Sequence, residues 1–194
     1  MPSPLAHASL ILAAGPVVVR AAPRLLREPS SDLASRQTAV LLGLTAFAFV
    51  APDLDFLPFL AMGLDASRLH GGPSHSLIAA ALFAPLFGLA AARWAGARIL
   101  PAMALGGAAY AMHIGLDLFN PGRGVGVLWP LQERTPTGLR WFEGAAHNDV
   151  KNWGRHRRTF LNEISFAAAM LGLGVLLWRA TAPRGASPTP EETP

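Results

Sequence analysis

Apolar residues occur along the chain in long blocks that are separated by polar segments. Five blocks contain few or no charged residues: residues 5–19, 38–64, 76–92, 99–116 and 164–178. Most of them are near the lower end of the about 17 to 25 residues that a helix needs to cross a bilayer. The pattern therefore predicts an all-α fold, a small polytopic membrane helical bundle with four to five short transmembrane helices.

The first apolar block is similar to a signal peptide in length, but no Lys or Arg precedes Arg20. Because a signal peptide requires a basic stretch before its apolar region, we expect a retained helix. The polar residues 20–36 contain a Ser30-Ser31-Asp32 capping signal. They are predicted to form a short loop that leads into the second helix.

The chain contains no internal repeat and no separate soluble domain. We expect residues 1–180 to form a single membrane-embedded helical domain with a polar loop at residues 120–160. Residues 181–194 are rich in Pro, Thr and Glu. This composition predicts a disordered tail.

Composition supports the membrane interpretation. Of the 194 residues, 52% are hydrophobic and 14% are charged, and the mean hydropathy is +0.35. A soluble domain is about 25% charged, so this chain has too few charges to cover a surface that faces water. The absence of cysteine excludes disulfides, thiolate metal sites, iron–sulfur clusters and a cysteine nucleophile. Any metal must therefore be held by His, Asp and Glu.

The net charge of +4 does not indicate a nucleic-acid partner, because the 16 Lys and Arg residues are scattered between the apolar blocks. That distribution is typical of segments that flank a membrane, so we expect membrane lipid as a partner and no nucleic acid. Alternating crossings place eight of these cations on each side of the membrane. The positive-inside rule therefore leaves the orientation open.

Charged residues in the apolar blocks require an explanation, because a central Asp costs about 2.5 to 3.5 kcal/mol at membrane depth. Such residues cluster with histidines at the ends of four predicted helices. If residues 20–36 lie on one side of the membrane, the first helix begins, the second ends, the third begins and the fourth ends on the other side. We therefore expect one metal site at that face. Its candidate ligands are His7, Asp53, Asp55, His70, His75, His113 and Asp117.

The spacing within each pair suits metal binding. His113 and Asp117 are four residues apart and share one helix face. His70 and His75 flank a Gly-Gly-Pro turn that can bring two imidazoles together. The two aspartates of the second block follow a proline and are predicted to lie where a helix breaks.

Asp and His ligands together favour Zn as the divalent metal ion, with Mn, Fe or Mg as alternatives. Seven ligands exceed the four of a tetrahedral zinc site, so either two metals or one metal with an outer shell of carboxylates fits. Glu163, at the start of the fifth predicted helix, is a candidate further ligand or base. The alternative for each residue is structural: a lone Asp can cap a helix, and His113 can form a hydrogen bond with Asp117.

At these residues the sequence resembles the YdjM-like family of inner-membrane-associated proteins, which are regarded as metal-dependent hydrolases. That family has an N-terminal His, a P-D-x-D element, an H-R-G-x-T-H-S element, and H-x-x-x-D followed by a Pro/Gly-rich turn and a later Pro. Matching elements occur here in the same order over residues 1–130: His7, Pro52-Asp53-Leu54-Asp55, His70-Gly71-Gly72-Pro73-Ser74-His75-Ser76, His113-Ile114-Gly115-Leu116-Asp117, Asn120-Pro121-Gly122 and Trp129-Pro130. One position differs. The Arg that usually follows the first His of the third element is Gly71 here, and Arg68 is a candidate replacement.

The resemblance implies an integral protein of the bacterial inner membrane that acts as a metal-dependent hydrolase. Its substrate would be a lipid-like or anionic small molecule, cleaved at a phosphoester or ester bond by a metal-activated water at one membrane face. No Gly-x-Ser-x-Gly element occurs, so a serine hydrolase has no support. The alternatives are a metal-binding transporter and a non-catalytic membrane anchor that docks another protein.

Overall fold

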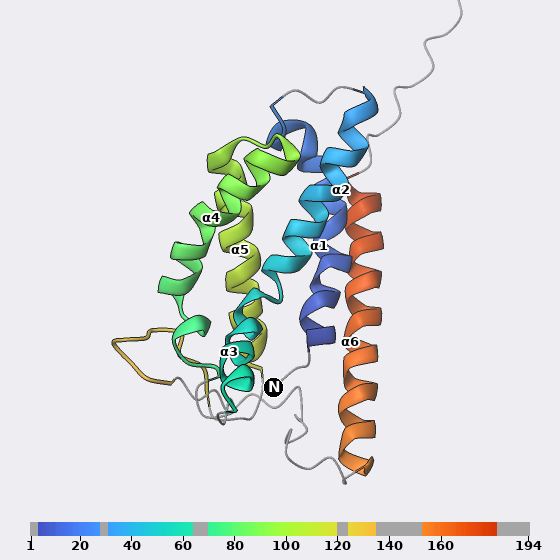
Figure 1. The fold of residues 1–194 in the computed structure, drawn as a ribbon. Coiled ribbons are helices and arrows are strands. Elements are labelled where there is room, and N and C mark those ends of the chain that lie inside the picture. Colours follow the sequence, from blue (N-terminus) through green and yellow to red (C-terminus); the bar gives the residue numbers. More distant parts are fainter. Residues whose placement is uncertain (1–3, 28–30, 64–69, 120–123, 135–152, 182–194) are drawn as a thin grey trace, which may run out of the picture.

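The computed structural model describes residues 4–27, 31–63, 70–119, 124–134 and 153–181. Figure 1 shows that long helices dominate it. The helical elements in chain order are α1 (Pro4–Leu25), α2 (Ser31–Ala48), the 3₁₀ turn η1 (Ala51–Asp55), α3 (Phe56–Ala61), the 3₁₀ turn η3 (Pro73–His75), α4 (Leu77–Ala95), α5 (Ile99–Asp117) and α6 (Trp153–Ala180). No strand is formed within these ranges, which confirms the all-α prediction.

The helices α1, α4, α5 and α6 are long and apolar enough to cross a membrane. A fifth candidate span consists of α2 together with η1 and the start of α3, and it is bent by 58°. The 19 residues of α4 extend about 28 Å at about 1.5 Å per residue, close to the about 30 Å of a hydrocarbon core. Leu82 and Leu86 of α4 and Leu100 of α5 are exposed, as expected for side chains that face lipid. The predicted number of four to five spans is confirmed.

Three helices extend well beyond the apolar blocks that predicted them. Helix α1 continues to Leu25, through two prolines, and α2 begins at Ser31. The prediction of a loop over all of residues 20–36 is therefore wrong, because helix occupies both of its ends. Helix α6 begins at Trp153, inside the segment 120–160 that was predicted as a polar loop. A helix can continue into polar sequence because each added turn pairs further backbone groups. The predicted tail at 182–194 lies outside the described residues.

The helices pack chiefly as two pairs, α4 with α5 and α1 with α6, and α2 contacts α1, α4 and α5. At one end of the bundle, backbone hydrogen bonds connect the end of α1 with the end of α4 and the start of α5. Arg27 N donates to Gly96 O, and Arg98 N donates to Leu25 O. At the opposite end α1 and α4 begin and α2 and α5 end (Figure 1). This arrangement agrees with the crossing order expected from the sequence.

Close contact between α4 and α5 depends on Gly106. A Cβ atom at this position would lie 2.2 Å from Cγ and 2.6 Å from Cβ of Phe87. Phe87 is buried and belongs to the main hydrophobic core, so it has little room to move away. The glycine therefore sets the distance between the helix that begins beside His75 and the helix that carries His113.

We expect Gly106→Ala to lower the apparent Tm of the detergent-solubilised protein, because overpacking a tight contact costs about 1 to 3 kcal/mol. Gly43→Ala on α2 is the matched control, since a Cβ there meets nothing within 4 Å. It should be neutral or stabilising by up to about 1 kcal/mol. Equal Tm values for the two variants would contradict this account of α4–α5 packing.

Candidate metal centre

Asp53 is held in place by a break in the helix between α2 and α3. Pro52 lacks a backbone donor, so the α-helical hydrogen-bond pattern cannot continue through it. The chain instead forms η1, in which Asp53 N donates to Val50 O at 3.1 Å. The predicted helix break is confirmed, and Asp53 is buried at the end of the bundle.

His75 is positioned by the turn that precedes α4. Gly71 has φ of +82°, a conformation that suits glycine, and η3 begins two residues later, after Gly72. Ser76 then caps α4, because its Oγ accepts a hydrogen bond from Ala79 N at 3.1 Å. The Tyr110 hydroxyl donates to Ser74 O at 2.7 Å and fastens the turn to α5. His75 is consequently fully buried.

His113 and Asp117 lie one turn apart in the last part of α5, and both are buried. His113 Nδ1 donates to the backbone oxygen of Phe49 at 2.7 Å. That carbonyl has no α-helical partner, because the amide of Asp53 bonds to Val50 instead. The break after α2 therefore also orients the imidazole of His113, and it leaves Nε2 to face the other residues of the cluster.

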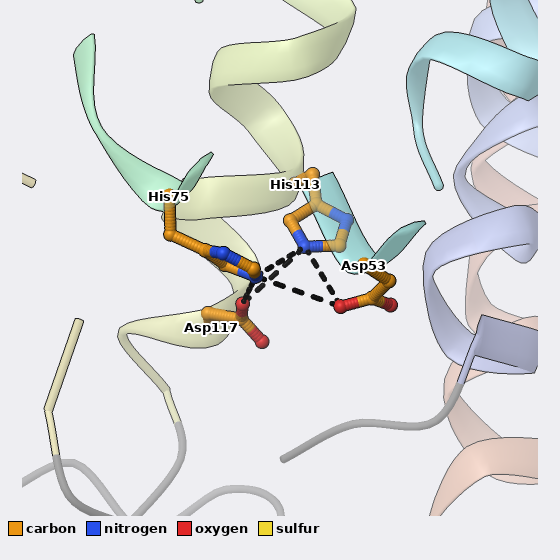
Figure 2. Close-up of side chains that lie close together, drawn as sticks. All are labelled: Asp53, His75, His113 and Asp117. Carbon is orange, nitrogen blue, oxygen red and sulfur yellow. Dashed lines mark hydrogen bonds and ion pairs between the residues drawn. The ribbon is translucent and has the colours of Figure 1, made fainter. Parts of the chain in front are cut away.

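The side chains of Asp53, His75, His113 and Asp117 point toward one another (Figure 2). One ligand atom from each lies within 4.8 Å of the others, so this buried group could hold a metal ion. His75 Nε2 is 3.2 Å from His113 Nε2 and 3.2 Å from Asp117 Oδ2. His113 Nε2 is 3.3 Å from Asp117 Oδ2 and 3.4 Å from Asp53 Oδ1. Asp53 Oδ1 is 3.5 Å from His75 Nε2.

These distances fit ligands that share one ion. Four ligands at about 2.0 to 2.1 Å from a tetrahedral centre are about 3.3 to 3.4 Å apart. Two Nε2–H groups cannot point at each other, so at least one of the facing imidazoles presents a lone pair. Both carboxylate oxygens of Asp117 are buried, and the imidazole nitrogens at 3.2 to 3.4 Å lie near them without hydrogen-bond geometry. A shared cation would satisfy these oxygens and the facing lone pair together, whereas leaving buried polar groups without hydrogen bonds is costly.

The other three predicted ligands surround this group. His7 Nδ1 is 3.2 Å from Asp53 Oδ2 and its Nε2 is 3.4 Å from Asp117 Oδ1. The His7 ring stacks on His113 with 3.7 Å between centroids. His70 Nε2 is 3.5 Å from Asp53 Oδ1, and His70 Nδ1 is 2.6 Å from Asp55 Oδ1. The structure thus brings all seven residues together, and metal binding by each of them stays a prediction.

The cluster attracts positive charge. Burial lowers the pKa of His75, but the nearby carboxylates of Asp117 and then Asp53 outweigh the burial, and the pKa is raised above its usual value. The same negative potential favours a divalent cation.

Some contributors could not be found from the sequence. The carbonyl of Phe49 is a backbone group and has no sequence signal. Arg134 donates to His70 O and Gly124 O, both at 3.2 Å, and its Nη1 lies 3.4 Å from where a Cβ on Gly71 would be. Arg68, the predicted replacement for the family's Arg, lies outside the described residues. Glu163 is buried on α6 and belongs to neither metal-competent group of the described residues.

Comparison with known proteins supplies the family. A family model described as YdjM inner membrane protein matches residues 8–183. The chain belongs to this family. The match includes every candidate ligand except His7, which lies one residue before it. No curated protein and no solved structure matches the chain significantly. The protein is therefore an integral protein of the inner membrane, with apolar helices that can span it.

A ligand that binds only the folded protein raises its stability by about 2.7 kcal/mol at a concentration 100 times its Kd. We therefore expect EDTA to lower the apparent Tm of the detergent-solubilised protein and added Zn²⁺ to restore it. His113→Ala removes one of the four closest groups and should abolish both shifts. A variant that still responds to EDTA and Zn²⁺ as the wild type does would exclude this cluster as the metal site.

Proposed function

We propose that the protein is a membrane-bound metal-dependent hydrolase that cleaves a phosphoester or ester bond of a lipid-like substrate. The observation that supports this proposal is the buried mixed Asp and His cluster at one end of a membrane bundle. A site at the bilayer surface suits a substrate with an anionic headgroup and a lipid tail. Asp53, His75, His113 and Asp117 would hold the metal, and their imidazole and carboxylate groups suit zinc.

Access to the cluster is one-sided. The side chains of His75, His113 and Asp117 are 0% exposed, whereas those of His70 and Asp55 are 15% and 14% exposed. Water and a substrate headgroup would therefore approach past His70. Nε2 of the His70 imidazole faces Asp53, and its Nδ1 forms a hydrogen bond with Asp55. A partly exposed imidazole supported by a carboxylate is typical of a general base.

A bound divalent cation supplies Lewis acidity, which acidifies water and polarises the oxygen of an ester or phosphoester. His70 Nε2 would take a proton from the attacking water. The water oxygen forms the new bond to phosphorus or to the carbonyl carbon, and the bond to the leaving oxygen breaks. His70 would then return the proton to that leaving oxygen.

The position of the cluster argues against a transporter. Transport sites commonly lie near the middle of the membrane, between two halves related by an internal repeat, and this chain contains no such repeat. Here the ligands lie at the starts of α1 and α4 and at the ends of α2 and α5. A non-catalytic anchor would have no need for a buried cluster of ionisable side chains, because burying such groups costs free energy.

Metal content tests the first half of the proposal. We expect detergent-purified wild type to contain a stoichiometric divalent metal by elemental analysis, and the double variant His113→Ala with Asp117→Ala to contain none. Folding of the variant is checked by circular dichroism and gel filtration. Equal metal in both proteins, or no metal in a folded wild type, would reject the proposal.

Turnover tests the second half. We expect the metal-loaded protein to release phosphate or fatty acid from mixed micelles of phospholipid or prenyl phosphate. His70→Gln should keep the metal and lower turnover by about 10² to 10⁴, the usual contribution of a general base. Thr45→Val is the matched control, because it removes a buried hydroxyl that bonds only to Leu41 O among the described contacts. A carrier or an anchor would show no turnover in any of these proteins.

A further inference from the structure

We propose that Asp55 is a positioning residue and not a metal ligand, and that the centre consequently holds one ion. This inference rests on the metal-binding half of the proposed function. Two groups of side chains in the described residues could hold a metal: the buried group of four, and Asp55 with His70 and His75. The question is whether the second group binds an ion of its own or supports the first.

Asp55 uses both carboxylate oxygens in hydrogen bonds. His70 Nδ1 lies 2.6 Å from Asp55 Oδ1. The Ser74 hydroxyl donates to Asp55 Oδ2 at 2.5 Å. Both distances are short, as expected for direct hydrogen bonds that a charged group strengthens. They are shorter than the about 3.3 Å that separates two ligands of one tetrahedral ion.

The Ser74 hydroxyl already bridges two of the three side chains that a second ion would need. Asp55 Oδ2 and His75 Nδ1 are 3.6 Å apart. The Ser74 oxygen contacts both atoms, at 2.5 Å and 2.9 Å. A hydroxyl has one proton, and Ser74 gives it to Asp55, so its oxygen accepts the proton of His75 Nδ1. The two contacts thus form a chain from His75 through Ser74 to the carboxylate.

The consequence is a fixed tautomer for each imidazole. Asp55 keeps a proton on Nδ1 of His70 directly and on Nδ1 of His75 through Ser74. In this tautomer Nε2 carries the lone pair that can bind a cation, and His75 Nε2 is the atom that faces His113 and Asp117. His113 has the same arrangement, with Phe49 O as the acceptor at Nδ1. Carboxylates that orient metal-binding histidines in this way strengthen binding without touching the metal.

The test is zinc stoichiometry and affinity, measured by elemental analysis and by competition with a chelator. We expect wild type and Asp55→Asn each to bind one ion, with affinity about 10 to 100-fold weaker in the variant. Ser74→Ala interrupts only the connection to His75 and should also bind one ion, with a smaller loss. Thr45→Val, the control hydroxyl, should bind as wild type does.

Cobalt substitution gives an independent readout. The visible absorption of bound Co²⁺ depends on the number of ligands, so Asp55→Asn and Ser74→Ala should keep the four-coordinate intensity of the wild type. Loss of a true ligand, as in Asp117→Ala, should lower it. If Asp55→Asn does not fold, the Ser74→Ala result decides: unchanged zinc affinity would overturn the inference.

Two ions in the wild type, or one fewer ion in Asp55→Asn than in the wild type, would overturn the inference while leaving a metal-dependent hydrolase intact. Unchanged zinc affinity in a folded Asp55→Asn protein would overturn it as well. No ion in the wild type would overturn both proposals. Because zinc binding is measured without substrate, failure to detect hydrolysis affects only the proposed function, and the affinity results would still support or reject the role of Asp55.

Discussion

Two buried carboxylates at one end of the bundle require positive charge close to them. Asp53 and Asp117 come from different helical segments, and both lie near three or more imidazole nitrogens. Burial of an ionised carboxylate without positive charge costs several kcal/mol. The histidines of α1, η3 and α5 can carry that charge themselves or share a metal cation with the carboxylates. The helix ends are thus held together by electrostatics in a fold that otherwise packs apolar side chains.

The scaffold around the site follows from the membrane. Helices α4 and α5 have 19 residues each, about the minimum length that crosses a bilayer. Little of either helix therefore extends beyond the membrane. The polar residues of a site must then lie at helix ends, where helix breaks and turns can direct them. In this protein η1 and η3 supply such turns on the same side of the bundle. A substrate that itself lies in the membrane surface would reach this side without leaving the bilayer.

The convergence of the candidate residues could be predicted from the sequence because it depends only on how many times the chain crosses the membrane. Each apolar block takes the chain to the opposite side of the membrane. The number of crossings does not depend on how the helices pack. Helix ends were harder to predict: α1 and α6 extend past their apolar blocks, since backbone hydrogen bonding continues where hydropathy no longer does. The separate parts played by Asp53 and Asp55, two residues apart, have no sequence signal. They depend on the Ser74 hydroxyl and on which oxygen each imidazole faces.

The interruption after α2 links two residues that are far apart in the chain. It directs Asp53 toward the cluster, and it frees the carbonyl of Phe49 that His113 uses. Any insertion, deletion or loss of proline that restored a continuous helix would move Asp53 and release the ring of His113 at the same time. The two positions therefore cannot drift independently during evolution. In related chains, the local sequence around residues 49–53 should change together with the neighbourhood of residue 113 or remain the same.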